Sequence, residues 1–133
     1  MCQKAFGAFY GPLVTGHEVV WTRGRLKHFQ SSNVARRGFC GDCGTPLYNN
    51  WTANEVIHPA IATLDDPSSV LPEFQIGTES RLAWTNDLAE LKAMTTDDIF
   101  KGYEALLDEI KGTNRQHPDH DTAVWPPGPP RAS

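Results

Sequence analysis

The sequence predicts a small, mainly β protein that ends in one amphipathic helix, and two features of its pattern lead to this expectation. Over the first two-thirds of the chain, short segments rich in β-branched and aromatic residues alternate with turn residues, which is typical of an antiparallel sheet. After Thr95 the apolar residues recur at helical spacing instead. The 133 residues suffice for a modest core and are too few for two ordinary domains, so we expect one domain.

The expected strands are bounded by residues that favour turns. Arg23-Gly24-Arg25 can turn a hairpin between the first two strands, and Asp65-Asp66-Pro67-Ser68-Ser69 has the composition of a loop. The predicted strands are Val19 to Thr22, Leu26 to Gln30, Arg37 to Cys40, Pro46 to Tyr48, Val56 to Leu64 and Phe74 to Thr78.

One amphipathic helix is expected within residues 95–112. Thr95-Thr96-Asp97-Asp98 offers a cap and acidic residues at its start, and Gly112 ends it. Its apolar stripe consists of Ile99, Phe100, Tyr103, Leu106, Leu107 and Ile110. We expect this stripe to dock on a β domain of residues 1–94, with a contact between two copies as the alternative. Residues 113–133 are rich in proline and are expected to be an extended tail.

Charge and hydropathy narrow the classes of partner. The formal net charge is −4 and no stripe of Lys and Arg is present, which argues against binding to the phosphates of a nucleic acid. No apolar run approaches the roughly 18 residues that a membrane span requires, and the N-terminus does not have the pattern of a signal peptide. We therefore expect a cytoplasmic protein that binds small molecules.

The cysteines are the strongest chemical signal in the chain. Three of them make a closed set of disulfides impossible and favour a metal site or a reactive thiol. Cys40-Gly41-Asp42-Cys43-Gly44 has the composition of a zinc knuckle, but two thiolates are only half of a four-ligand site. A redox pair is the weaker alternative, since the first cysteine does not open a predicted helix. Cys2 or a histidine must complete the zinc site, and no histidine can be named for that role.

Other polar groups give weaker signals. His117 and His120 can trap a divalent ion, but they lie in the expected tail. Ser31-Ser32 has no base placed beside it by the sequence, so a turn is the better interpretation. Asp65-Asp66 is interpreted in the same way, as a pair of loop-forming residues before Pro67.

Several segments, in this order and spacing, resemble the glutathione-dependent formaldehyde-activating enzyme family, which also contains centromere protein V. The segments are Cys2-Gln3-Lys4-Ala5-Phe6-Gly7-Ala8, Ser31-Ser32 followed by Arg36 or Arg37, Phe39-Cys40-Gly41-Asp42-Cys43-Gly44-Thr45-Pro46-Leu47, Thr63-Leu64-Asp65-Asp66-Pro67 and Thr78-Glu79-Ser80-Arg81-Leu82-Ala83-Trp84. The resemblance spans roughly residues 1 to 90.

The resemblance implies a fold, a cofactor and a reaction. The implied fold is a zinc-binding β-tent of folded-over antiparallel sheets, and the implied activity is that of a carbon–sulfur lyase resembling S-(hydroxymethyl)glutathione synthase, which joins formaldehyde to the co-substrate glutathione. Cys40 and Cys43 match the later half of the family's structural zinc site. Cys2 matches the last cysteine of its catalytic zinc site.

The chain departs from the family pattern at its start. The early cysteine pair, the first strands and two of the three catalytic cysteines have no counterpart before Cys2. We therefore expect an N-terminally truncated member, in which Met1 replaces an internal residue of a longer chain. The alternative function is an inactive zinc-binding scaffold or interaction module, and two copies that share a zinc site would form a homodimer. Gln75 stands where relatives frequently carry His, with no assigned consequence.

Overall fold

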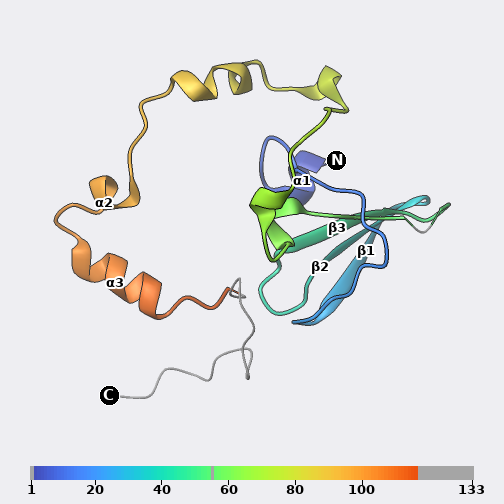
Figure 1. Ribbon diagram of the computed structural model, residues 1–133, viewed down its shortest axis with the longest axis horizontal. Coiled ribbons are helices and arrows are strands. Elements are labelled where there is room, and N and C mark those ends of the chain that lie inside the picture. The colour runs from blue at the N-terminus through green and yellow to red at the C-terminus, as the bar shows by residue number, and fades with distance from the viewer. Residues whose placement is uncertain (1, 55, 117–133) are drawn as a thin grey trace.

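The protein is built on one antiparallel sheet, which confirms the mainly β expectation. The computed structural model describes residues 2–54 and 56–116. Four strands pair in sequence order, each with the next (Figure 1). They are β1 (Leu26–Ser32), β2 (Ala35–Cys40), β3 (Pro46–Trp51) and β4 (Ile57–Pro59).

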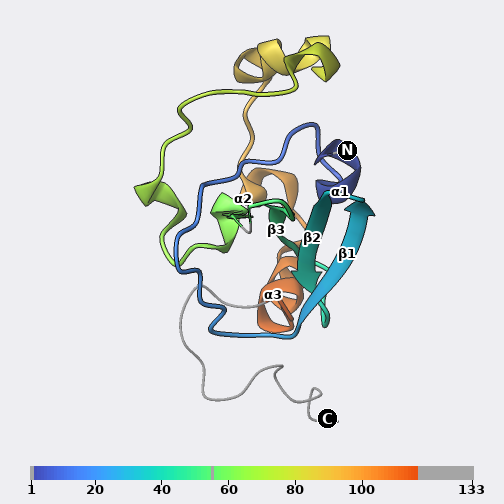
Figure 2. The same ribbon diagram turned by 90° about the vertical axis from the view of Figure 1, so that its right-hand side faces the viewer.

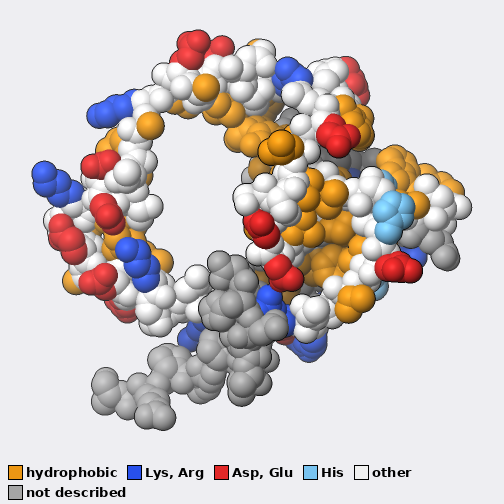
Figure 3. All heavy atoms as spheres, in the orientation of Figure 1, with side chains coloured by type: hydrophobic (Ala, Val, Ile, Leu, Met, Phe, Trp, Pro, Cys, Tyr) orange, Lys and Arg blue, Asp and Glu red, His pale blue; other side chains and the backbone are white. Residues whose placement is uncertain are grey.

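Short helices precede and follow the sheet. The α-helices are α1 (Cys2–Phe6), α2 (Thr96–Ile99) and α3 (Glu104–Gly112). The 3-10 helices are Ile61–Thr63, Pro67–Ser69, Thr78–Ser80 and Ala83–Glu90. Figures 1 and 2 show α1 at one end of the sheet, whereas the chain from residue 70 onwards runs in a wide arc that carries α2 and α3 away from the strands. In the space-filling view this arc encloses an open ring (Figure 3).

The centre of the sheet is organised around Gly38 of β2, which pairs with His28 on one side and Tyr48 on the other. Because Gly38 has no side chain, the Tyr48 ring lies over it, and the Tyr48 hydroxyl is 2.7 Å from Nδ1 of His28. The Trp21 ring also lies beside that of Tyr48, at 5.6 Å between centroids. The buried side chains near this row are Ala35, Cys40, Tyr48, Asn49, Asn50 and Ala60.

The β4 edge of the sheet is covered by the N-terminal segment. The backbone N–H of Gly16 donates to the carbonyl of Ile57 at 2.8 Å, and that of Val14 donates to the carbonyl of Pro59 at 3.0 Å. Proline has no N–H to continue the ladder, so β4 ends at Pro59 and a 3-10 turn follows. The expected strand over residues 56–64 is therefore shorter than predicted.

Two predicted strands are wrong. Residues 19–22 and 74–78 have the composition of strands, but neither segment pairs with a neighbouring backbone, and residues 78–80 form a 3-10 helix. Val20 is 78% exposed and Phe74 is 76% exposed. A strand exists only where a partner strand accepts its hydrogen bonds, and composition alone does not supply that partner.

The single helix expected over residues 95–112 is also wrong, because the segment folds as α2 and α3. Its predicted start is confirmed: Thr95 and Asp98 form a reciprocal capping box. Gly102, at φ +86°, reverses the chain between the two helices. Leu107 is buried, whereas the other large side chains of α3 are about half-exposed.

Docking of this stripe on the sheet stays a prediction. The expected tail begins at residue 113, and its residues 117–133 lie outside the described part of the chain. Within the part that is described, every helix is too short or too polar to cross a bilayer.

Replacing Gly38 with Ala tests the row at the centre of the sheet. A Cβ at Gly38 would overlap Cε1 of Tyr48, so the ring must leave its place and lose its bond to His28. We expect a loss of about 1–3 kcal/mol in the free energy of unfolding, measured by urea denaturation. Gly112→Ala is the control, because its Cβ meets open space at the end of α3. Equal stability of the two variants would contradict this account.

The capping box makes α2 sensitive to pH. Hydrogen bonds from the backbone N–H and the hydroxyl of Thr95 lower the pKa of Asp98. The box therefore forms fully above the ordinary pKa of an aspartate and is lost as the pH falls through the lowered value. We expect the Thr95 amide resonance in NMR spectra to follow this titration and to be insensitive to pH in Asp98→Asn. Asp97→Asn, one position earlier in the same turn, should keep the titration; its loss there would refute the assignment.

Candidate functional site

The predicted cysteine pair lies on the turn that joins β2 to β3. Cys40 is the last residue of β2, and its N–H donates to the carbonyl of Thr45 at 2.9 Å. The N–H of Gly44 donates back to the carbonyl of Cys40, also at 2.9 Å. Gly44 has φ +78°, a conformation that a residue with a side chain rarely adopts. These two bonds close the turn and fix Cys40 and Cys43 on it.

The two thiols of this turn differ in exposure and touch each other. Cys40 is 3% exposed, whereas Cys43 is exposed, and neither forms a disulfide. Burial raises the pKa of Cys43, but hydrogen bonds from the Thr45 hydroxyl, the Thr45 N–H and the Cys40 thiol outweigh it, and the pKa of Cys43 lies below its ordinary value. The negative charge of Asp42 opposes this lowering. The exposed thiol is therefore the more readily ionised of an ordinary cysteine's range of settings.

The Thr45 hydroxyl links the turn to the end of α3. Its Oγ1 is 3.1 Å from Sγ of Cys43 and donates to Oε1 of Gln116 at 3.2 Å. A hydroxyl has one proton, so while Thr45 donates to Gln116 it accepts from the Cys43 thiol. Once Cys43 is ionised, the hydroxyl proton can turn to the sulfur instead.

An ion pair holds the acidic residue of the turn. Nε and a terminal nitrogen of Arg25 lie 2.9 and 2.8 Å from the same oxygen of Asp42, and the N–H of Gly41 donates to the Arg25 carbonyl. Arg25 thus ties the turn to the residue that precedes β1. It also offsets the charge of the carboxylate that stands next to Cys43 in sequence.

The described residues supply half of a zinc site at this turn. Two thiols on one turn are a suitable donor pair for zinc, which requires four ligands. Within residues 2–54 and 56–116, no three or more His, Cys, Asp or Glu side chains gather as a group that could hold a metal ion. The nearest carboxylate, Asp42, is engaged by Arg25. Cys2 begins α1, but its side chain lies outside the described part, so the residues described here do not complete the site.

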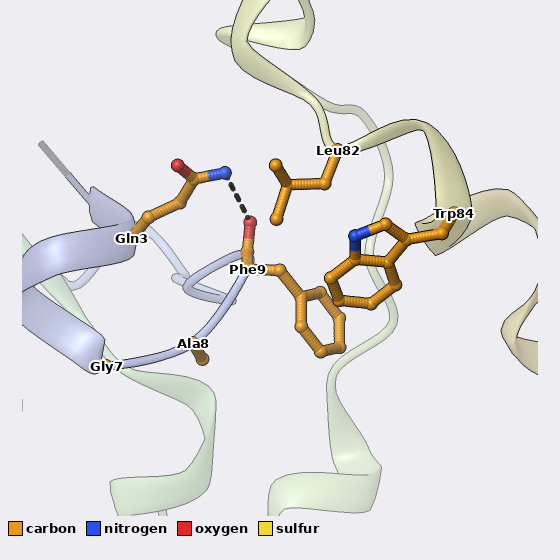
Figure 4. A pocket seen from close by; sticks show the side chains of 6 residues that line it. All are labelled: Gln3, Gly7, Ala8, Phe9, Leu82 and Trp84. Carbon is orange, nitrogen blue, oxygen red and sulfur yellow. Dashed lines mark hydrogen bonds between the residues drawn. The ribbon is translucent and has the colours of Figure 1, made fainter.

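A larger cavity lies at the other side of α1. It has a volume of about 410 Å³ and lies between the N-terminal segment and the segment that opens the Ala83–Glu90 helix (Figure 4). Its walls are Gln3, Gly7, Ala8, Phe9, Leu82 and Trp84. Two of the motif segments, which lie some 75 residues apart in the chain, therefore meet here.

Gln3 holds the two walls of this cavity together. Its Nε2 donates to the carbonyl of Phe9 at 3.2 Å and to the carbonyl of Ser80, 77 residues away, also at 3.2 Å. The rings of Phe9 and Trp84 meet edge to face at 5.1 Å between centroids and form an apolar wall (Figure 4). The cavity thus combines aromatic surface with amide and carbonyl groups.

A smaller cavity connects α1 with the cysteine-bearing turn. Its volume is about 170 Å³, and Ala5 and Phe6 of α1 line it together with Gly44 and Pro46. The helix that begins at Cys2 therefore lines both cavities. Cys2 stands at the start of the element between the larger cavity and the turn of Cys40 and Cys43.

The weaker candidates from the sequence have structural roles. Asp66 accepts hydrogen bonds from the N–H and hydroxyl of Ser68, which confirms the loop interpretation, and Asp65 pairs with Arg23 at 3.6 Å. The Ser31 hydroxyl donates to the carbonyl of Ala35. His117 and His120 lie outside the described residues.

Sequence reasoning assigned no role to Gln3, Phe9 or Trp84. Gln3 and Trp84 stand inside the quoted motif segments, and this membership was the available signal. Their contact depends on chain segments far apart in sequence, which no local pattern reports. Gln75, the departure from the family pattern, accepts a hydrogen bond from Arg81 of the same region.

Comparison with known proteins agrees with this arrangement of motifs. The family model described as glutathione-dependent formaldehyde-activating enzyme matches residues 1–80. No curated protein and no solved structure matched in the corresponding comparisons. The matched region contains α1, the cysteine-bearing turn and the whole sheet. It covers more than half of the 133 residues, and the chain belongs to the glutathione-dependent formaldehyde-activating enzyme family.

Proposed function

We propose that this protein promotes the addition of the glutathione thiol to formaldehyde or a related aldehyde. This is the carbon–sulfur lyase type of reaction that S-(hydroxymethyl)glutathione synthase represents. Family membership supports the reaction class. The observation that carries the site is the meeting of two motif segments, residues 3–9 and 80–84, at one open cavity.

The larger cavity suits a small peptide thiol and an aldehyde. Its volume of about 410 Å³ lies within the ordinary range of small-molecule sites. Phe9, Leu82 and Trp84 offer apolar surface, and the ribbon beside them in Figure 4 leaves the cavity open on one side. Formaldehyde is small enough to enter with the thiol already seated.

The reaction itself asks for positioning. The sulfur attacks the carbonyl carbon, a carbon–sulfur bond forms, and the electron pair of the carbonyl moves to oxygen, which takes up the proton that the thiol released. Holding the two reactants together converts a bimolecular encounter into a step within one complex. Gln3 gives both of its amide hydrogens to Phe9 and Ser80, so it is a positioning residue that keeps the two walls in register.

Zinc assistance belongs to this proposal only in part. A bound zinc ion supplies Lewis acidity and favours thiolate at neutral pH. Cys40 and Cys43 as metal ligands, and Cys2 as the remnant of a catalytic zinc site, stay predictions. Since the described residues offer two of four ligands, we assign no step to the metal. The β-tent, the cytoplasmic location and the homodimer likewise stay predictions.

A second candidate is a non-catalytic interaction module. The observation that favours it is the number of large apolar side chains exposed along the arc that follows the sheet. Among them are Leu71, Phe74, Ile76, Leu91, Met94, Ile99 and Tyr103. Contiguous apolar surface on a protein marks contacts with other molecules.

Exchange NMR with ¹³C-formaldehyde and glutathione tests the catalytic proposal. The protein should accelerate the interconversion of formaldehyde and its glutathione adduct above the spontaneous rate. Gln3→Glu replaces the donor with a carboxylate that faces two carbonyl oxygens, and we expect the acceleration to fall by about tenfold or more.

Gln30→Glu is the matched control, because the Gln30 amide also donates to a backbone carbonyl, that of Ser32 on β1, away from the cavity. Its rate should equal that of the unaltered protein. If the unaltered protein gives only the spontaneous rate, the interaction module becomes the better proposal. Circular dichroism of each variant separates loss of function from loss of fold.

A further inference from the structure

The turn between β2 and β3 carries two thiols that the proposed reaction does not use. Cys40 and Cys43 are both free and hydrogen-bonded to each other. The larger cavity, where the aldehyde reaction is placed, is lined by other residues. The chemistry of this pair is therefore a separate question.

The surroundings of the pair do not match a closed zinc site. A structural zinc requires four ligands, and the described residues around Cys40 and Cys43 supply no third His, Cys, Asp or Glu. Asp42, which stands between the two cysteines, is held by Arg25 instead. Thr45 occupies the nearest position to the Cys43 sulfur, and its hydroxyl is not a usual zinc ligand.

We propose that Cys40 and Cys43 form a dithiol–disulfide couple that exchanges with glutathione disulfide. Three geometric facts support this: the thiols share one tight turn, they touch, and one is exposed while the other is buried. A disulfide across two intervening residues needs the cysteines brought close together, and the bond from Gly44 N–H to the Cys40 carbonyl already closes the chain around them. The proposal stands apart from the aldehyde reaction and takes from the family only its glutathione dependence.

The difference in exposure sets the order of events. Cys43 is exposed and can meet a disulfide from solution, whereas Cys40 is 3% exposed and can be reached only from within the turn. Cys43 is therefore the attacking residue and Cys40 the resolving residue.

The exchange balances without any further oxidant. Cys43, having given up its proton, attacks one sulfur of glutathione disulfide; that disulfide breaks, and a glutathione thiolate leaves with the electron pair and takes up the proton. Cys40 then loses its proton and attacks the Cys43 sulfur. The second glutathione leaves as a thiolate and takes up the proton from Cys40. Two protein thiols are oxidised to one disulfide, and one glutathione disulfide is reduced to two molecules of glutathione.

Arg25 is a positioning residue for this exchange. Glutathione disulfide carries more carboxylates than ammonium groups, so a bare carboxylate beside Cys43 would repel it. Arg25 offsets the Asp42 charge through contacts of 2.8 and 2.9 Å and fixes the turn to the chain before β1. Its guanidinium is largely exposed, so this assistance should weaken as salt is added.

The sequence allows the disulfide to be located directly. Trypsin cuts after Lys4, Arg37 and Arg81, and no Lys or Arg lies between the last two. Cys2 therefore leaves in a four-residue peptide, and Cys40 and Cys43 stay together in the peptide 38–81. We would equilibrate the purified protein in mixtures of glutathione and glutathione disulfide, trap the thiols with an alkylating reagent and weigh the peptides.

The expected result is an internal disulfide in peptide 38–81, about 2 Da lighter than the dithiol form, whose fraction follows the ratio of glutathione disulfide to glutathione. Cys2 is the internal control and should form only a mixed disulfide with glutathione. Cys40→Ser should stop at a mixed disulfide on Cys43, and Cys43→Ser should leave Cys40 unmodified over the same time. Both thiols alkylated at every ratio, or protected by one zinc per chain in elemental analysis, would overturn the proposal.

A pair of arginine variants tests the positioning role. Arg25→Gln should slow formation of the mixed disulfide by about threefold at low salt, and the difference should vanish at high salt. Arg23→Gln removes an equal charge two residues earlier, where Arg23 pairs with Asp65 rather than with the turn, and should leave the rate unchanged. Equal rates for both variants at low salt would refute the role of Arg25. Neither result depends on the aldehyde reaction, which exchange NMR measures separately.

Discussion

Two backbone hydrogen bonds close the turn between β2 and β3, and the geometry of both candidate chemistries depends on them. The bond from Cys40 N–H to the Thr45 carbonyl sets where β3 begins, and the bond from Gly44 N–H to Cys40 shapes the turn. Because β3 starts there, Tyr48 comes to lie opposite Gly38. The same closure puts the exposed and the buried thiol side by side. A shift of one residue would move every later side chain of β3 to the other face.

Gly38 extends this constraint across the sheet. The Tyr48 ring crosses the empty position above Gly38 and meets His28 on β1, so three strands share one buried contact. Burial raises the pKa of Tyr48, against the lowering effect of the Arg36 charge, and the hydroxyl stays protonated for this contact. The sheet is small and its buried set consists mainly of modest side chains, so one well-placed aromatic ring carries a large share of the packing.

Sequence reasoning located what local pattern determines and missed what distant contacts determine. The strands over residues 26–51 were found because alternating side chains and tight turns follow one another directly. Residues 74–78 look like a strand, but pairing needs a partner that no local pattern specifies. The cysteine pair was found by its spacing, and the start of α2 by its capping residues. The contact of Gln3 with Ser80 spans 77 residues, so only the folded chain brings that cavity together.

The element α1 connects the two sites physically. It lines the larger cavity through Gln3 and the smaller one through Phe6, and the smaller cavity is bounded on its other side by Gly44 of the cysteine-bearing turn. A disulfide is shorter than a contact between two thiols, so closing it must move the turn against the wall that α1 shares. The two sites take glutathione in different oxidation states, one as thiol and the other as disulfide. A shared wall between them gives the oxidation state of the turn a direct mechanical route to the cavity where the thiol would react.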